Sequence, residues 1–72
     1  AEDIVLESLD RYKSLIDKNE GNACIFLYYG ISLFYFGNYK ESLKNLNKSN
    51  EANSEYYETY FYLGEVYSKL NN

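Results

Sequence analysis

Residues 23–46 read ACIFLYYGISLFYFGNYKESLKNL, and their apolar pattern changes halfway along. The first fourteen residues are apolar on nearly every side, which is typical of a helix that its neighbours bury. Gly37 and Asn38 then break the run, because glycine readily takes the left-handed conformation that ends a helix. Beyond the break, apolar residues return every three or four positions between charged ones, as in an amphipathic helix. The stretch therefore predicts two helices, over about 23–36 and 39–50.

A further amphipathic helix is expected before this stretch. Val5, Leu9, Tyr12 and Ile16 form an apolar stripe at helical spacing, and charged residues occupy the positions between them. This helix should run over about 3–18.

Turn residues mark the remaining boundaries. Gly21 is available for the positive φ that ends the first helix, and Asn22 can cap the start of the next one. A last helix is expected over about 55–70, with Ser54 as its N-cap. The sequence therefore predicts an all-α fold of four helices.

A period of 34 residues runs through the chain. The tripeptide Glu-Ser-Leu at 7–9 recurs at 41–43, and Gly30 recurs as Gly64. Aligning residues 1–38 with residues 35–72 gives seven identities. Such a period is typical of helical repeat arrays, in which neighbouring units bury each other's apolar faces. We expect one domain, whose parts are a half unit over 1–21, a complete unit over 22–54 and a half unit over 55–72.

The complete unit resembles the tetratricopeptide repeat (TPR), a 34-residue helix–turn–helix family. The resemblance rests on signature positions, which are Phe26, Tyr29, Gly30, Leu33, Tyr39, Ser42, Leu46 and, in the next copy, Tyr60, Leu63, Gly64 and Tyr67. It implies antiparallel helices that wind into a right-handed superhelix. It also implies close packing of helices at both glycines. The chain departs from the family pattern at Ser49 and Ser54, where alanine and proline are common.

The resemblance also implies a function. In this family the first helix of each unit lines a concave groove, which binds a peptide or a partner helix without catalysis. The groove positions here are Cys24, Leu27, Tyr28, Ile31, Phe34, Tyr35, Glu58, Phe61, Tyr62, Glu65 and Lys69. Tyrosine offers a large contact area at low entropic cost, so we expect a protein or peptide partner. The alternative is a structural element, in which the aromatic surface is covered by a longer chain or by another copy.

The last helix should leave one face open. Tyr60, Leu63 and Tyr67 repeat residues that face the following helix in the complete unit, and the sequence contains no such helix after them. The final two asparagines match the Gly37-Asn38 turn, so we expect the natural chain to continue. Without that continuation, self-association through this face is expected.

Composition argues against other classes of protein. The chain has no histidine and one cysteine, Cys24, so we expect no usual zinc site, no histidine general base and no cofactor. We read Cys24 as a packing residue, and Glu58 and Glu65 as a solvated face rather than a catalytic pair. A net charge of −4 gives no electrostatic basis for binding nucleic acid.

No membrane or targeting segment is expected either. The longest apolar run, Ala23–Phe36, has fourteen residues. A membrane span needs about 20. The acidic N-terminus lacks the basic region of a signal peptide. The sequence names no compartment, and the cytoplasm is the default expectation.

Overall fold

Four helices follow one another along the chain: α1 (Glu2–Asp17), α2 (Ala23–Phe36), α3 (Tyr39–Ala52) and α4 (Tyr57–Leu70). The structure, a computed structural model, describes the backbone of residues 2–71 and the side chains of residues 6–71. Val5 and Asn72, which the sequence pattern used, lie outside the described side chains. The all-α, four-helix prediction is confirmed, and each helix begins and ends within two residues of its expected bounds.

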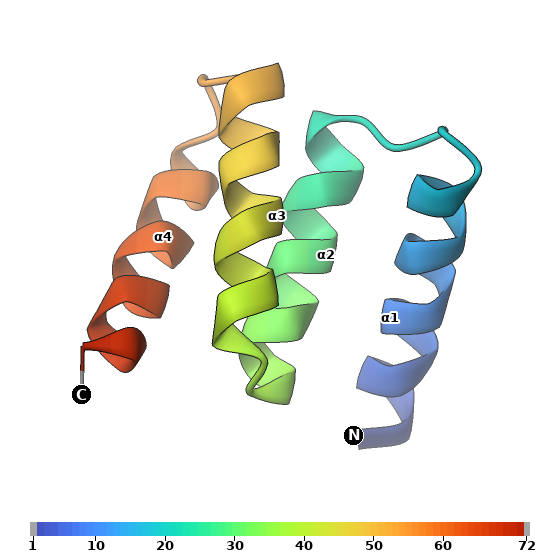
Figure 1. Cartoon of the computed structure of the whole chain (residues 1–72), viewed down its shortest axis with the longest axis horizontal. Coiled ribbons are helices and arrows are strands. Elements are labelled where there is room, and N and C mark those ends of the chain that lie inside the picture. Colours follow the sequence, from blue (N-terminus) through green and yellow to red (C-terminus); the bar gives the residue numbers. More distant parts are fainter. Residues whose placement is uncertain (1, 72) are drawn as a thin grey trace.

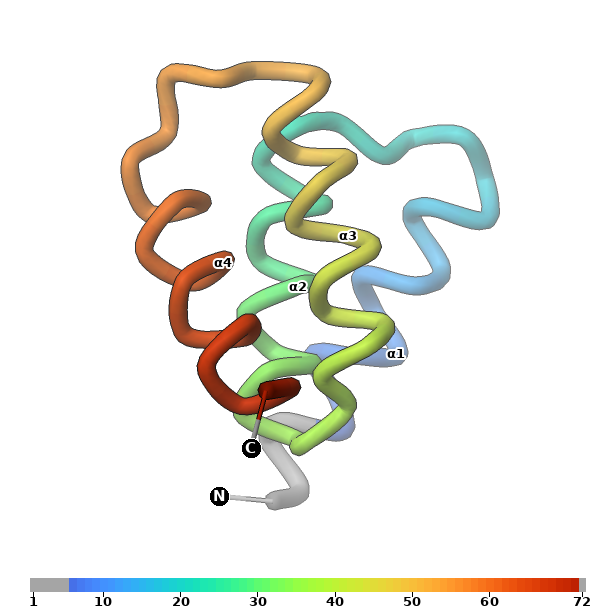
Figure 2. The backbone as a smooth tube through the Cα atoms, turned by 60° about the vertical axis from the view of Figure 1, so that its left-hand side comes forward, coloured from blue at the N-terminus to red at the C-terminus, as the bar shows by residue number. Residues whose placement is uncertain are grey.

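Adjacent helices run antiparallel and lie side by side in chain order (Figure 1). The Cα atoms span 32 × 28 × 16 Å, so the molecule is a flat slab. α3 packs against both α2 and α4, and its contact with α2 is the most extensive between any two helices. α4 also touches α2, which lies behind α3 and α4 when the molecule is turned (Figure 2). Among the described residues α1 packs on α2 alone.

The contact between α2 and α3 depends on a glycine. A Cβ atom on Gly30 would lie 2.7 Å from the Cγ atom of Leu46, so no larger residue fits without a shift. Two fully buried serines of α3 hold the helices at this distance. Ser42 donates its hydroxyl to the Gly30 carbonyl at 2.6 Å, and Ser49 donates to the Ala23 carbonyl at 2.7 Å. Ser49 therefore adds a hydrogen bond that an alanine at this position could not make.

Gly64 does not pack in the same way. The resemblance implied close contact at both glycines, but no atom of the described residues lies within 4 Å of a Cβ atom placed on Gly64. The physical reason is that Gly30 faces α3, whose Leu46 side chain lies against it, whereas no described residue lies over Gly64.

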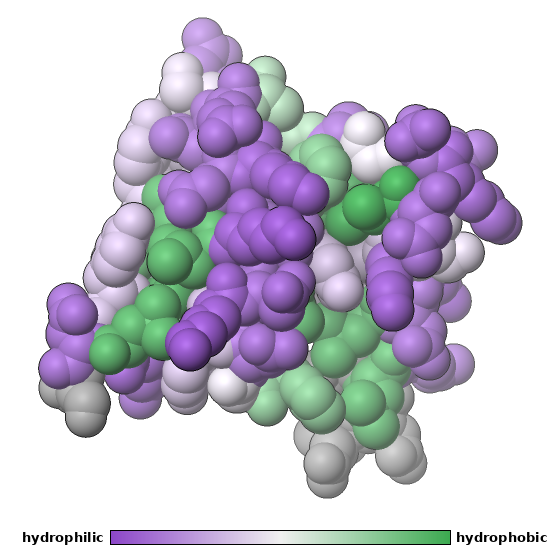
Figure 3. All heavy atoms as spheres, viewed as in Figure 1, coloured by the Kyte–Doolittle hydropathy of each residue, from purple (hydrophilic) through white to green (hydrophobic). Residues whose placement is uncertain are grey.

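The core is small and lies between α2, α3 and α4. Leu27, Leu46 and Val66 form its centre, and partly buried apolar residues surround them. Among residues 6–71, nine large apolar or aromatic side chains are exposed, and five of them are on α4. The outside of α3 is hydrophilic, whereas hydrophobic atoms show on both sides of it (Figure 3). A slab this thin therefore leaves much of its apolar surface uncovered, most of all on its last helix.

The helix ends follow local chemistry, with one correction near Gly21. Asn19, not Gly21, takes the left-handed conformation after α1, with φ at 58°. Asparagine tolerates this conformation better than most residues do. Gly21 instead lies 3.2 Å from both Ile16 and Phe26, measured from a Cβ placed on it. The predicted cap at Asn22 is confirmed, because its side chain accepts a hydrogen bond from the Ile25 amide at 3.0 Å.

A second correction concerns the start of α4. Ser54 was expected to cap the helix, but the N-cap is Tyr56, which makes no side-chain capping bond. The Ser54 carbonyl instead accepts a hydrogen bond from the Tyr60 hydroxyl at 2.9 Å. Asn53 accepts a hydrogen bond from the Glu55 amide at 2.9 Å, which favours a turn before the helix begins.

The two glycines give a matched test of the α2–α3 contact. Gly64→Ala should stabilise the fold by about 0.5–1 kcal/mol, because alanine favours helix and the site is open. Gly30→Ala should destabilise it, because the clash with Leu46 costs about 1–3 kcal/mol and exceeds the same gain. Urea unfolding at low protein concentration measures both. A Gly30→Ala protein as stable as Gly64→Ala would contradict the close approach.

The hydroxyl of Thr59 gives a second test of the core. Thr59 is fully buried, and its Oγ1 atom has no hydrogen-bond partner among the described residues. Thr59→Val keeps the shape and removes the unpaired hydroxyl, so it should stabilise the fold by about 1 kcal/mol. Thr59→Ser keeps the hydroxyl and loses the methyl group, and it should destabilise. Urea unfolding measures the free energy of unfolding of both variants. If Thr59→Val destabilised the fold, the result would show that the hydroxyl is hydrogen-bonded.

Candidate functional site

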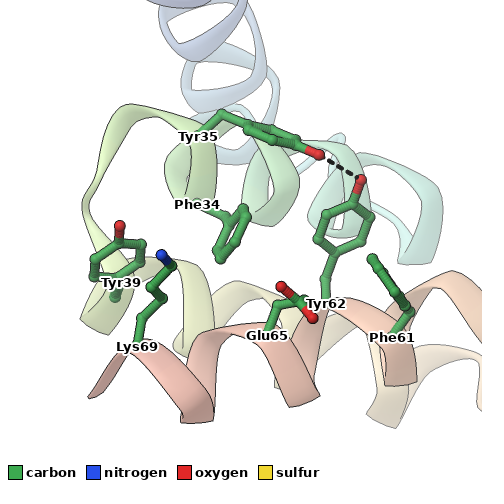
Figure 4. A pocket seen from close by; sticks show the side chains of 7 residues that line it. All are labelled: Phe34, Tyr35, Tyr39, Phe61, Tyr62, Glu65 and Lys69. Carbon is green, nitrogen blue, oxygen red and sulfur yellow. Dashed lines mark hydrogen bonds between the residues drawn. The ribbon is translucent and has the colours of Figure 1, made fainter. Parts of the chain in front are cut away.

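A hollow of about 400 Å³ lies between α2 and α4. The side chains that line it are mainly aromatic: Phe34, Tyr35, Tyr39, Phe61, Tyr62, Glu65 and Lys69. In Figure 4 Phe34 points into the hollow from α2, while Glu65 and Lys69 rise toward it from α4. The start of α3 closes one end through Tyr39. The site therefore combines residues from three helices.

Helix geometry explains why these residues meet. On α4, Phe61, Glu65 and Lys69 are four positions apart and so share one face, with Tyr62 beside them. On α2 the last turn supplies Phe34 and Tyr35.

The aromatic rings of the hollow form a connected cluster. The ring of Phe34 lies 5.2 Å from that of Tyr35, 5.7 Å from that of Tyr39 and 5.7 Å from that of Tyr62, centroid to centroid. Tyr62 also meets Phe61 edge to face, at 5.1 Å. Tilted and edge-to-face pairs at these distances attract beyond the effect of burial. The rings on the two walls of the hollow therefore hold one another in place.

One hydrogen bond joins the two walls. The hydroxyls of Tyr35 and Tyr62 lie 3.1 Å apart, and either can donate (Figure 4). This bond raises the pKa of Tyr62 above its ordinary value, and burial and the Glu65 carboxylate act in the same direction. Tyr35 is 65% exposed, so its ring stands at the rim of the hollow.

A second aromatic pair lies outside the hollow. Tyr28 stacks on Tyr12 of α1 with their ring centroids 6.3 Å apart, and it remains half exposed. The neighbouring Cys24 raises the pKa of Tyr28 most, and Glu58 adds to the effect. Tyr28 and Cys24 are four residues apart on α2 and so share one face of that helix.

The structure sorts the expected groove residues into three groups. Phe34, Tyr35, Phe61, Tyr62, Glu65 and Lys69 all line the hollow, while Cys24, Tyr28 and Glu58 do not. Leu27 was expected in the groove, but it is 3% exposed and belongs to the core, because Leu46 and Val66 cover it. Ile31 packs against the same core.

Sequence reasoning missed one residue of the hollow. Tyr39 was named as a signature position of the repeat and not as a groove residue, yet it lines the hollow. The predicted turn at Gly37 could have indicated the position of Tyr39. The chain reverses there, and Tyr39 returns to the side of Phe34. A residue that follows a tight turn belongs to the same end of the molecule as the residues that precede it.

Other kinds of site find little support. Among residues 2–71 no group of three or more cysteine, histidine, aspartate or glutamate side chains is placed to hold a metal ion. None of the described helices is both long and apolar enough to cross a membrane. A second hollow, of about 270 Å³ between α1, α2 and α3, has mixed charges. It includes Tyr29, whose pKa is raised mainly by burial.

Comparison with known proteins brings no relative to light. No protein-family model, no curated protein and no solved structure matches the chain significantly. The tetratricopeptide resemblance therefore rests on the residues of this chain alone.

The tyrosine bond makes the hollow sensitive to alkaline pH. Since the pKa of folded Tyr62 lies above the ordinary value of 10.0, the bond stabilises the protein below that pH. The contribution is lost as the pH rises through the folded-state pKa. Titrating the tyrosine rings by NMR should place Tyr62 above 10.0, and Tyr35→Phe should lower its pKa more than Glu65→Gln does. If the Tyr35→Phe substitution left the pKa of Tyr62 unchanged, that result would contradict the hydrogen bond.

Proposed function

We propose that the chain is a non-catalytic protein-interaction module of the tetratricopeptide type, which binds a peptide or a partner helix in the hollow between α2 and α4. The observation that carries the proposal is the aromatic lining: five of its seven residues are phenylalanine or tyrosine. Interface centres are enriched in aromatic residues. A hollow of this composition favours apolar side chains of a partner.

The size of the hollow fits such a partner. Ligand sites have volumes of about 300–1,000 Å³, so a site of about 400 Å³ is at the lower end. It accommodates a few side chains of a peptide rather than a large cofactor. The rest of the peptide would follow the exposed rings of Tyr35 and Phe61, which are 65% and 60% exposed.

The polar groups of the hollow suit recognition better than catalysis. Glu65 and Lys69 are one turn apart on α4, and both reach the site. They offer one acceptor group and one donor group to a peptide. The second carboxylate that a catalytic pair would need, Glu58, is not part of the lining. The chain has no histidine that could act as a general base.

Electrostatics further narrow the partner. The chain carries a net charge of −4, which attracts basic or neutral partners and repels acidic ones over long range. We therefore expect the best ligands to combine apolar side chains with a basic residue.

The test compares three exposed aromatic residues. A peptide array selects ligands, and titration then measures their affinity. Tyr35→Ala and Phe61→Ala should each weaken binding by about 1–2 kcal/mol, the range of an interface hot spot. The control, Tyr57→Ala, removes a ring that is 77% exposed outside the hollow, and it should leave the affinity unchanged.

Two results would overturn the proposal. One is a set of best ligands that are acidic and lack apolar side chains. The other is equal loss of affinity in the control and in the two variants of the hollow. The alternative function, a structural or self-assembly element, is favoured by exposed tyrosines on a different surface of α4.

A further inference from the structure

We propose that the chain assembles head to tail, with α1 of one copy packed on the outer face of α4 of the next. The outer face of α4 consists of Tyr57, Tyr60, Gly64 and Tyr67, which recur once per helical turn. None of these residues lines the aromatic hollow, so the two surfaces are separate. The proposal is therefore independent of peptide binding.

The outer face of α4 is open and apolar. Tyr57, Tyr60 and Tyr67 are 77%, 51% and 48% exposed. Between them Gly64 leaves a notch, since no atom of residues 6–71 lies within 4 Å of a Cβ atom placed there. Burying exposed apolar surface is favourable, and contiguous apolar patches commonly mark interaction sites.

The chain itself shows what covers such a face. The residues 34 positions earlier on α2 are Ala23, Phe26, Gly30 and Leu33, and α3 packs over them. Leu46 fills the notch at Gly30, and the Lys48 amino group lies 5.6 Å from the Phe26 ring centroid. This α2–α3 contact is the most extensive between helices in the structure. It is therefore a template for a partner of the outer face.

α1 matches this template in part. Its residues 34 positions before Ser42, Leu46 and Ser49 of α3 are Ser8, Tyr12 and Leu15. Ser8 keeps the hydroxyl and Tyr12 keeps a large side chain at the position of Leu46, whereas Leu15 replaces the hydrogen bond of Ser49 with apolar contact. Ser8 can therefore donate its hydroxyl to the carbonyl of Gly64 in another copy, as Ser42 donates to Gly30.

These residues of α1 remain accessible. Ser8, Tyr12 and Leu15 are all partly exposed, and among the described residues α1 packs on α2 alone. The stacking of Tyr12 on Tyr28 occupies one side of α1, at a centroid distance of 6.3 Å.

The charges of the two surfaces permit this contact. The outer face of α4 contains no charged residue, and neither do the three matching positions of α1. Arg11 shares the face of these three residues and stands 34 positions before the buried Asn45 of α3. A contact that follows the template therefore places the Arg11 guanidinium beside the tyrosine rings of α4, and aromatic faces attract a cation.

The geometry of this contact makes the assembly open-ended. Different surfaces of each copy meet, so every added copy presents a new free α4 at one end and a new free α1 at the other. Such heterologous contacts form rings or filaments rather than closed dimers. The average mass should therefore rise continuously with concentration.

Two blocked variants of the 72-residue chain test the proposal. Gly64→Leu fills the notch on α4, where the open site tolerates a side chain. Ser8→Lys places a long charged side chain on the α1 surface. In sedimentation experiments across a concentration series, the unmodified chain should form species larger than a dimer. Each variant alone should weaken association at least about tenfold.

The decisive experiment mixes the two variants. Each keeps one intact surface, α1 in the first and α4 in the second, so the mixture should form a one-to-one dimer and stop there. Circular dichroism should show unchanged helix content in both variants. The control, Lys44→Ser on the exposed side of α3, should associate like the unmodified chain.

Three results of these experiments would overturn head-to-tail assembly. If the unmodified chain stays monomeric at all concentrations, the outer face of α4 does not bind another copy. A helix of another protein or of a longer chain would then cover it. Association of a single variant to the same extent as the unmodified chain means that a different surface is used. A mixture that stays monomeric, with both variants folded, shows that the two surfaces do not bind each other. Peptide binding by a monomeric chain would still support the hollow.

Discussion

The close approach of α2 and α3 at Gly30 supports the rest of the structure. Because no side chain separates the helices there, Leu46 reaches the core and meets Leu27 and Val66. Val66 in turn fixes α4 against α3. The hollow between α2 and α4 exists because α3 packs against both helices and holds them in place. Aromatic rings from the last turn of α2 and from α4 form its walls. A change at one glycine would therefore alter the core first and the site second.

Much of the fold could be predicted from the sequence, because helix periodicity and turn chemistry are local. Asn22 and Gly37 end or begin helices by bonds within a few residues, and both positions were anticipated. The errors arose where two residues could perform the same role. Asn19 took the left-handed conformation that Gly21 was expected to take, and Tyr56 stands at the N-cap position expected for Ser54.

The site was predicted less completely. The spacing of residues along a helix predicts which of them share a face, but it does not predict how deeply each side chain is buried. Leu27 and Phe61 are repeat-related and were expected on the same groove. The structure buries the first at 3% exposure and leaves the second 60% exposed, since Leu27 has neighbours that Phe61 lacks. The bond between Tyr35 and Tyr62 joins residues 27 apart, and no local pattern encodes it.

The single neighbour of α1 has a consequence for how the molecule opens. Among the described residues α1 packs on α2 alone, whereas α2 and α3 each contact two or more helices. Proteins open in cooperative units, and units with few packed neighbours open at lower free energy than the whole molecule. Backbone amide hydrogens of α1 should then exchange with solvent when that helix alone detaches. Those of α3 should exchange only when the whole molecule unfolds. We therefore expect two levels of protection against amide exchange, with the boundary between them in the turn at residues 18–22.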